Sequence, residues 1–162
     1  MRELHVVNAA ELARAYAAAD YAVRLDGDIL GLRVGVRASD LEAYCPAGCY
    51  VFITAWNPAS QPTCDRRNQA ADASLVTQLH ATGAQRHPAW AQDPGGQWRE
   101  PGWLLADLDA STTELLARQF GQAAVLAWRR GEPVRLRMLL PRPCPVDPSI
   151  DADTAAFTDW VE

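Results

Sequence analysis

The chain has 162 residues, of which 49% are hydrophobic and 22% are charged, and this length and composition are typical of one globular domain. Its formal charge of -5 comes from 20 acidic and 15 basic residues, and every basic residue is an arginine. Because the densest arginine groups are only pairs, such as Arg129 with Arg130, the sequence argues against nucleic acid as a partner, whereas a small anion site is compatible with it.

The first residues of the chain predict neither a signal peptide nor a membrane-spanning segment, because charges at Arg2, Glu3 and Glu11 interrupt the apolar stretches. Four cysteines are also too few for a secreted disulfide scaffold of this size. We therefore expect a cytoplasmic protein without a membrane partner. The sequence gives no indication of an oligomeric state.

The first predicted helix begins at Asn8. This residue is a suitable N-cap, and Glu11 three residues later completes a capping-box pattern. Leu12, Tyr16 and Ala19 recur at helical spacing, so we expect them to share the buried face of this helix.

Two strand regions follow this helix. Apolar residues alternate on both sides of the turn signal Asp26-Gly27, which predicts an antiparallel hairpin. Residues 38–49 are expected to form a short helical turn or a loop. The apolar run YVFITAW at residues 50–56 is typical of a central strand, which Pro58 prevents from continuing.

The middle of the chain combines a long helix with a loop-rich segment. Residues 64–82 are rich in helix formers, and Gly83 provides a stop signal. Residues 87–103 contain many prolines and glycines, so we expect them to form mainly loops. They lead into a predicted strand at residues 103–108.

The last part of the chain predicts a helix, a hairpin and a second short helix. Asp109 or Ser111 is a suitable cap for a helix over residues 111–121, which ends at a glycine. Two strands are expected on either side of residues 130–133. A short docked helix is expected at residues 153–162.

The order of these elements indicates the fold class. Helices that are interleaved with hairpins, rather than with single strands, indicate an α+β fold with a largely antiparallel sheet. The sequence therefore predicts a single α+β domain at residues 1–140, with helices packed mainly on one face of the sheet. Residues 141–162 are predicted to form a Pro- and Asp-rich C-terminal tail.

Four motifs occur in a specific order: TAWNPAS at residues 54–60, Asn68 in the next helix, Glu100 in WREPGW, and FGQAAV at residues 120–125. Over residues 16–139 this TAWNPxS, Asn and FGQxAV pattern resembles an uncharacterised bacterial domain-of-unknown-function family. The resemblance implies no particular reaction. Where the family pattern has serine or threonine after the glutamate, this chain has Gly102, and the missing hydroxyl argues against a nucleophile in that loop.

Polar side chains gather at the end of the predicted central strand, just before a helix. Such positions favour small-molecule sites, because side chains leave the core there and helix N-termini expose unpaired N–H donors. Arg67 together with the helix dipole would favour a small anionic ligand. The predicted ligand-binding residues are Thr54, Trp56, Asn57, Ser60, Arg67, Asn68 and Gln122.

These residues also have a purely structural interpretation. Asn57 and Pro58 can form a turn that leaves Trp56 in the core. Arg67 can be a solvated surface residue. Gln122 lies at a helix-to-strand corner, where a buried amide commonly bonds loop backbone.

Glu100 is the candidate catalytic acid or base. The flanking Trp98 and Trp103 would desolvate its carboxylate, which favours a role in proton transfer. The structural alternative is a solvated carboxylate in a loop.

A zinc site is the other chemistry that the sequence raises. Cys45, Cys49 and Cys64 with His80 or His87 supply suitable ligand types, but structural zinc sites usually have two close ligand pairs and only one exists here. We therefore predict no metal and no cofactor.

Common catalytic and nucleotide-binding motifs, such as GxGxxG and GxxxxGK, are absent from the sequence. The leading hypothesis is a cytoplasmic binding or accessory module with a small polar pocket. One alternative is an enzyme, a hydrolase or transferase on a nucleotide-like substrate, in which Glu100 is the general base and Arg67 holds an anionic group. The other is a protein-interaction domain that exposes tryptophans.

Overall fold

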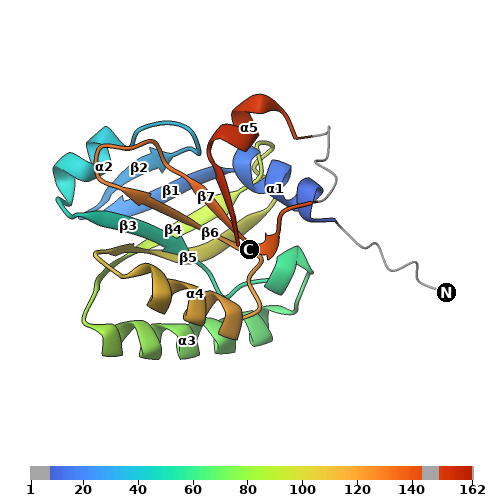
Figure 1. Ribbon diagram of the computed structural model, residues 1–162. Coiled ribbons are helices and arrows are strands. Elements are labelled where there is room, and N and C mark those ends of the chain that lie inside the picture. Colours follow the sequence, from blue (N-terminus) through green and yellow to red (C-terminus); the bar gives the residue numbers. More distant parts are fainter. Residues whose placement is uncertain (1–7, 144–149, 162) are drawn as a thin grey trace.

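The structure is a computed structural model that describes residues 8–143 and 150–161 (Figure 1). Its helices are α1 (Ala9–Ala18), α2 (Ser39–Tyr44), α3 (Asp65–Thr82), α4 (Ala110–Gln119) and α5 (Ala152–Ala156), with the 3-10 turn η1 (Pro58–Ser60). Its strands are β1 (Asp20–Leu25), β2 (Asp28–Leu32), β3 (Cys49–Ile53), β4 (Gln85–Gln92), β5 (Arg99–Ala106), β6 (Ala124–Arg129), β7 (Leu136–Pro141) and β8 (Thr158–Val161). Predicted features that fall on residues 1–7, 144–149 and 162 lie outside the described residues.

The described strands form one sheet in the order β2-β1-β4-β5-β3-β6-β7-β8. Neighbouring strands run antiparallel, except that β7 and β8 are parallel. The predicted fold class is therefore confirmed: the chain is a single α+β domain with a largely antiparallel sheet.

Local signals in the sequence set several element boundaries. Asn8 Oδ1 accepts a hydrogen bond from the backbone N–H of Glu11 at 2.8 Å, and Asp109 Oδ1 accepts one from the first turn of α4 at 2.7 Å. The predicted hairpin between β1 and β2 also forms, with positive φ angles at Asp26 and Gly27. The predicted starts of α1 and α4 are thus explained by the caps.

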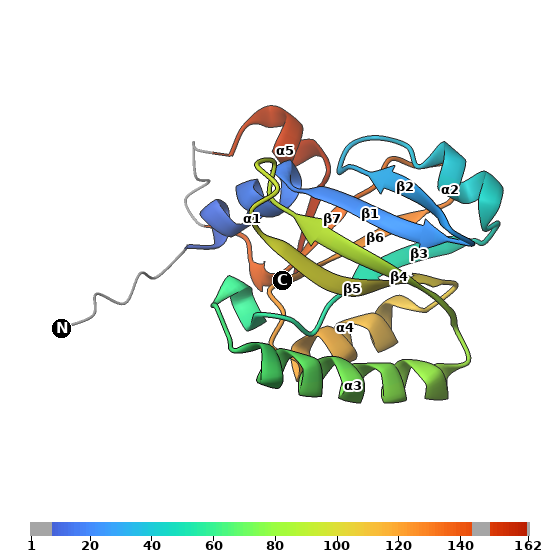
Figure 2. The same cartoon turned by 180° about the vertical axis from the view of Figure 1, so that it is seen from behind.

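β3 sends alternate side chains to the two faces of the sheet. Val51 and Ile53 share a buried apolar cluster with Leu75 and Leu79 of α3 and Leu116 of α4. Both views of the whole chain place α3 and α4 together on one side of the sheet (Figures 1 and 2). These two helices cover the centre of that face.

The opposite face of β3 belongs to a second apolar core. Tyr50 and Phe52 point into it, and α1 and α2 contribute Leu12 and Leu41. Tyr50 stacks on Trp128 of β6, with ring centroids 5.4 Å apart. α1 and α2 therefore cover this side of the sheet, so helices lie on both faces and not, as the sequence predicted, mainly on one.

The sheet curves so strongly that the segment after β2 reaches the segment before β7. The backbone N–H of Gly35 donates to the carbonyl of Val134 at 2.8 Å, and the N–H of Val134 donates to the carbonyl of Val36 at 3.0 Å. Arg37 and Pro133 form a further antiparallel bridge. These contacts close the second core at one end.

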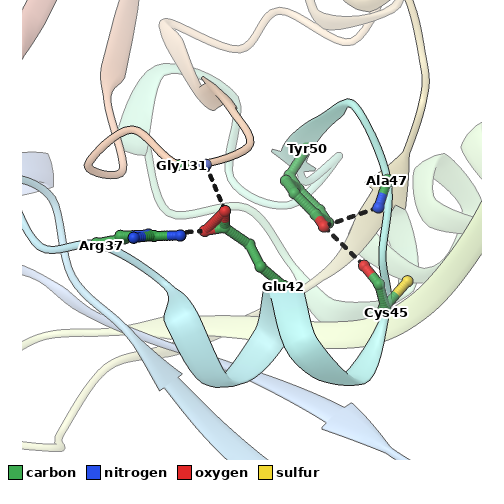
Figure 3. A network of polar contacts seen from close by, with 6 residues as sticks. All are labelled: Arg37, Glu42, Cys45, Ala47, Tyr50 and Gly131. Atoms are coloured by element: carbon green, nitrogen blue, oxygen red, sulfur yellow. Dashed lines mark hydrogen bonds and ion pairs between the residues drawn. The ribbon is translucent and has the colours of Figure 1, made fainter.

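A buried glutamate attaches α2 to the turn between β6 and β7 (Figure 3). Glu42 is 3% exposed, and its Oε1 accepts a hydrogen bond from the N–H of Gly131 at 2.5 Å. Arg37 Nε lies 3.9 Å from the other carboxylate oxygen. In the same view, the Tyr50 hydroxyl donates to the carbonyl of Cys45 at 2.7 Å, which ties the end of α2 to β3.

The prediction of loops at residues 87–103 is wrong for most of this segment, because β4 and β5 form a long hairpin there. Pro88 pairs with Trp103, and Pro101 pairs with Trp90. The pairing of β4 with β1 does not include Pro88, and the pairing of β5 with β3 does not include Pro101. The missing N–H of each proline therefore removes no hydrogen bond from these two ladders. The prolines are compatible with strands for this reason.

The C-terminal segment contains a helix and a strand, where the sequence predicted a helix at residues 153–162. α5 begins after Asp151, whose side chain accepts a hydrogen bond from the N–H of Thr154 at 2.6 Å. β8 then lies beside β7, and Arg135 donates two hydrogen bonds of 2.9 Å to Asp159. In the described part of this segment, the predicted helix is therefore shorter and is followed by a strand.

Candidate functional site

A cavity of about 260 Å³ lies where α1 meets the ends of β3, β4, β5 and β6. β3 ends at Ile53, earlier than the predicted end at residue 56, and the chain then turns along the edge of this cavity. The predicted site residues that line the cavity are Thr54, Asn57, Ser60, Glu100 and Gln122.

The turn after β3 has an unusual backbone. Asn57 adopts a left-handed conformation with φ 43° and ψ 69°, and Ala59 and Ser60 also have positive φ angles. This conformation is rare for non-glycine residues and is least costly for asparagine. Surrounding contacts must therefore hold the turn in place.

Asn68 of α3 supplies these contacts. Its Oδ1 accepts a hydrogen bond from the backbone N–H of Asn57 at 2.9 Å, and its Nδ2 donates to Asn57 Oδ1 at 2.9 Å and to the carbonyl of Thr63 at 3.1 Å. The N–H of Thr63 also donates to Asn57 Oδ1, at 3.0 Å. Asn68 is 2% exposed and does not line the cavity, so it holds Asn57 in position without contributing to the cavity wall itself.

Glu100 lies on β5 at the centre of the polar side of the cavity. Its Oε1 accepts a hydrogen bond from Asn57 Nδ2 at 3.0 Å and another from Trp98 Nε1 at 2.8 Å. The sequence places Trp98 only two residues away, and the structure turns its indole back onto the carboxylate. Trp98 remains 44% exposed and also lines the cavity. These two bonds fix the orientation of the carboxylate.

Thr54, Trp56 and Gln122 stabilise the same turn through backbone contacts. Thr54 Oγ1 donates to the carbonyl of Pro101 at 2.6 Å and accepts from the N–H of Trp56 at 3.0 Å. Gln122 Nε2 donates to the carbonyl of Trp56 at 3.1 Å, which is the backbone role expected of an amide at this corner. Trp56 is half-buried and is not among the lining residues.

Two tyrosines complete the polar edge of the cavity, namely Tyr16, which the sequence placed only on the buried face of the first helix, and Tyr21, to which it assigned no role. The hydroxyls of Tyr16 and Ser60 lie 2.7 Å apart, and the Tyr21 hydroxyl donates to the carbonyl of Tyr16 at 2.7 Å. Burial raises the pKa of both phenols above the ordinary value, and the charge of Glu100 adds to the effect. Both hydroxyls are therefore neutral near pH 7.

Arg67, the residue that suggested an anionic ligand, does not take part in the cavity. It is exposed on α3 and is not among the lining residues. The charged side chains in the described lining are Asp93 and Glu100, both acidic. The electrostatic character of the cavity is therefore opposite to the one predicted from the sequence.

Most of the remaining wall of the cavity is apolar. It consists of small or aliphatic side chains on α1 and the strands together with one aromatic ring, and examples are Ala19, Phe52, Ala91 and Leu126. The sequence placed Ala19 on the buried face of a helix and Phe52 in a central strand, but it placed Ala91 in a loop. Their position around one cavity depends on the hairpin of β4 and β5, which the sequence did not predict.

The described cysteines, Cys45, Cys49 and Cys64, do not form a metal-binding arrangement. Among the described residues, no group of three His, Cys, Asp or Glu side chains is placed to hold a metal ion. Cys45 Sγ lies 3.7 Å from His87 Nε2, but burial raises the pKa of this thiol and lowers the pKa of the histidine. Both groups are therefore neutral near pH 7, and the pair has no activated thiolate.

None of the described helices has the length and hydrophobicity that a membrane crossing requires. No curated protein and no solved structure matched the chain. The segment that does match a family runs from the end of β3 into β6 and contains Asn57, Asn68, Glu100 and Gln122. Residues 53–125 match the uncharacterised family described as "Protein of unknown function (DUF3293)".

Proposed function

We propose that the protein is a binding module for a small, largely apolar molecule that carries one cationic or hydrogen-bond-donating group. The observation that carries the proposal is a fixed carboxylate, Glu100, in the wall of a mostly apolar cavity. The cavity volume of about 260 Å³ lies just below the range of roughly 300–1,000 Å³ that is usual for drug-sized ligands. The ligand is therefore expected to be small.

Glu100 is suited to recognition because its geometry is fixed before a ligand arrives. Asn57 and Trp98 both donate to Oε1, whereas Oε2 takes part in no hydrogen bond within the described part of the chain. A carboxylate oxygen without a protein donor can accept a hydrogen bond from a ligand. Because the bonds to Oε1 already hold the Glu100 side chain in place, ligand binding costs less side-chain conformational entropy.

The charge of the lining favours a neutral or cationic ligand over the anionic one predicted from the sequence. An anion would approach Asp93 and Glu100, and Arg67 lies outside the lining. Like charges in a partly enclosed site repel more strongly than they do in water. A protonated amine beside Glu100 would instead form a charge-assisted hydrogen bond.

An enzyme that uses Glu100 as a general base is the second candidate. Glu100 lies in the cavity wall, and that position is what such a mechanism requires. The hydroxyls of Tyr16 and Ser60 supply hydrogen-bonding groups at the same edge. The nucleotide-like substrate that the sequence suggested depended on Arg67 and is not retained.

The proposal retains the cytoplasmic location predicted from the sequence, and the bacterial origin that the resemblance implies. The thiols of Cys45, Cys49 and Cys64 are free, which is compatible with a reducing compartment.

A thermal-shift screen tests the proposal with three matched sets of small aromatic compounds, namely amines, alcohols and carboxylates. A ligand that binds only the folded state raises the melting temperature by mass action. We expect amines to give the largest shift, alcohols a smaller one, and carboxylates none. If no amine or alcohol raises the melting temperature at millimolar concentration, the binding proposal is wrong.

Two variants connect the response to the cavity. Glu100→Gln keeps the shape and removes the charge, so amines should bind at least tenfold more weakly while alcohols change little. Ala91→Leu fills the apolar wall and should weaken both classes. Glu132 is exposed and does not line this cavity, so Glu132→Gln is the control for the loss of one negative charge elsewhere on the protein. Each hit is also incubated with the protein and analysed for conversion, and loss of conversion in Glu100→Gln would favour the enzyme.

A further inference from the structure

The outward-facing side of β1, β4 and β5 carries arginines and tryptophans that are far apart in the sequence. Ala22 pairs with Trp90, and Trp90 pairs with Pro101, so these residues share one face. Their strand neighbours Val23 and Ala89 are buried on the opposite face. The register therefore gathers side chains from three strands on one surface, which we call the Arg/Trp face.

The arginines on this face lie within cation–π distance of the tryptophans. The Cζ atom of Arg99 lies 4.1 Å from the ring centroid of Trp90, and Arg24 lies 6.0 Å from the same ring. Arg86 lies 5.6 Å from the centroid of Trp103. A cation–π contact with an indole uses no N–H donor of the guanidinium, so those donors remain available to an anion.

The Arg/Trp face is locally basic although the chain has a formal charge of -5. The strand register places Arg24, Arg86 and Arg99 on it, and Arg33 lies beside it through its contact with Asp20. Asp20 pairs with Arg33 at 2.7 Å, and Asp72 of α3 accepts a hydrogen bond from Trp103 Nε1 at 2.9 Å. Three arginines therefore carry positive charge that no described salt bridge neutralises.

This face is also accessible. Arg24, Arg99, Pro88 and Pro101 are exposed, and Trp90 is half-buried. In Figure 2, where β1, β4 and β5 face the viewer, α3 runs along one side and no helix crosses β1 and β4. The prolines add flat apolar surface between the two tryptophans.

We propose that the Arg/Trp face binds single-stranded nucleic acid. These arginines would contact phosphates, and unpaired bases would lie against the exposed edges of the tryptophans and the prolines. Duplex DNA fits less well, because its bases are not available for stacking. A lipid surface fits less well, because Trp90 and Trp103 are half-buried and do not project as an apolar membrane anchor.

The sequence argued against nucleic acid because arginines next to each other occur only in pairs. Arg24 and Arg99 are remote along the chain, and only the pairing of β1 with β4 and of β4 with β5 brings them to the same indole. The proposal is independent of the cavity, which lies on the other face of the sheet.

Fluorescence anisotropy of a labelled oligothymidylate with the full chain tests the proposal. We expect binding at low salt, with a slope of log affinity against log salt of about -2, since each of three arginine contacts contributes roughly 0.7. The double variant Arg24→Ala with Arg99→Ala should weaken binding at least tenfold, while Arg24→Lys with Arg99→Lys should retain part of it. Arg118→Ala, an exposed arginine on α4, is the matched control and should bind as the wild type does.

A folding defect is excluded by circular dichroism and a melting curve of each variant. Trp90→Leu keeps an apolar side chain but removes the ring, so it should weaken oligothymidylate and leave polyglutamate unchanged. Absence of binding at low salt, or an unchanged affinity in the double variant, overturns the proposal. Equal affinity for polyglutamate, for duplex DNA or for anionic vesicles would also overturn it, because a general anion surface would then suffice.

Discussion

The Asn68 side chain bonds both the backbone and the side chain of Asn57. Its Oδ1 accepts from the Asn57 backbone N–H, and its Nδ2 donates to Asn57 Oδ1, each at 2.9 Å. Both residues are buried, so water cannot replace these bonds without rearrangement. The left-handed turn at the edge of the cavity therefore depends on a residue that the cavity does not contain.

Asn68→Ala is expected to destabilise the fold by about 1–3 kcal/mol, because buried groups of Asn57 and Thr63 lose their partners. Urea unfolding followed by circular dichroism measures this loss. The neighbouring Gln69→Ala is exposed on the same helix and should change stability by less than about 0.5 kcal/mol. Equal stability of Asn68→Ala and wild type would show that the left-handed turn does not depend on Asn68.

Replacing Asn57 separates backbone strain from side-chain bonding. Asn57→Gly removes the side chain but accepts a φ of 43° without strain, whereas Asn57→Ala adds a left-handed penalty of about 1–2 kcal/mol. Asn57→Ala should therefore be less stable than Asn57→Gly in the same urea experiment. A reversed order would contradict the assignment of strain to this position.

Gly102 permits close approach of β5 to the end of β3. A Cβ at this position would lie 2.7 Å from the carbonyl oxygen of Ile53 and 2.9 Å from the ring of Phe52, a lining residue of the cavity. We expect Gly102→Ala to cost about 1–3 kcal/mol and to displace Phe52. Gly31→Ala, in a strand with no atom within 4 Å of the added Cβ, is the matched control and should be neutral or stabilising. Comparable losses in both variants would contradict the packing argument.

Glu42 is expected to matter for stability through Gly131. Glu42→Ala leaves the Gly131 N–H without its acceptor and should reduce the free energy of unfolding by about 1–3 kcal/mol. Arg37→Ala should cost less than about 1 kcal/mol, because Arg37 is 58% exposed and 3.9 Å away. Guanidinium unfolding of both variants compares the two contacts, and an equal loss would assign the stabilisation to the ion pair instead.

The ion pair of Asp159 with Arg135 gives an acid-dependent contribution to stability. Hydrogen bonds from Arg135 hold the pKa of Asp159 below its ordinary value, so folding favours the charged form. This contribution is present above the unfolded pKa of about 3.9 and is lost as the pH falls through the lower folded value. Because both side chains are partly exposed, it should amount to about 1 kcal/mol or less.

Melting curves of Asp159→Asn and wild type at a series of pH values test this contribution. The variant should melt at a lower temperature at pH 7, and the difference should disappear at acidic pH below the folded pKa. In an Arg135→Gln background, Asp159→Asn should have little further effect at any pH. A difference that persists unchanged in acid would assign the effect to packing of β8.

Local signals in the sequence were sufficient to predict most of the helices and two of the hairpins. Caps at Asn8 and Asp109 act within one turn of the chain, and the Asp26-Gly27 turn determines its own hairpin. The hairpin of β4 and β5 was missed because Pro88 and Pro101 resemble loop residues. They are acceptable in strands only where the pairing with the neighbouring strand does not include them, and that depends on how far the ladders of β1 with β4 and of β3 with β5 extend.

The candidate site, like the fold, could be predicted from the sequence only in part. The polar residues after β3 are contiguous in sequence, and five predicted side chains do line one cavity. The role of Asn68 as a support, the exclusion of Arg67 and the participation of Tyr16 depend on the direction in which each side chain leaves its helix. Composition and spacing near one strand end do not determine those directions.

The most direct test of the proposed binding site is a ¹H–¹⁵N NMR titration with the amine that gives the largest thermal shift. The chain has six tryptophan indole N–H groups, and that of Trp98 donates to Glu100, as does the side-chain amide of Asn57. We predict that the signals of Trp98 Nε1 and Asn57 Nδ2 move most, and that Glu100→Gln needs at least tenfold more amine for the same fraction bound. Saturable shifts confined to Trp90 and Trp103, with Trp98 and Asn57 unchanged, would contradict this prediction.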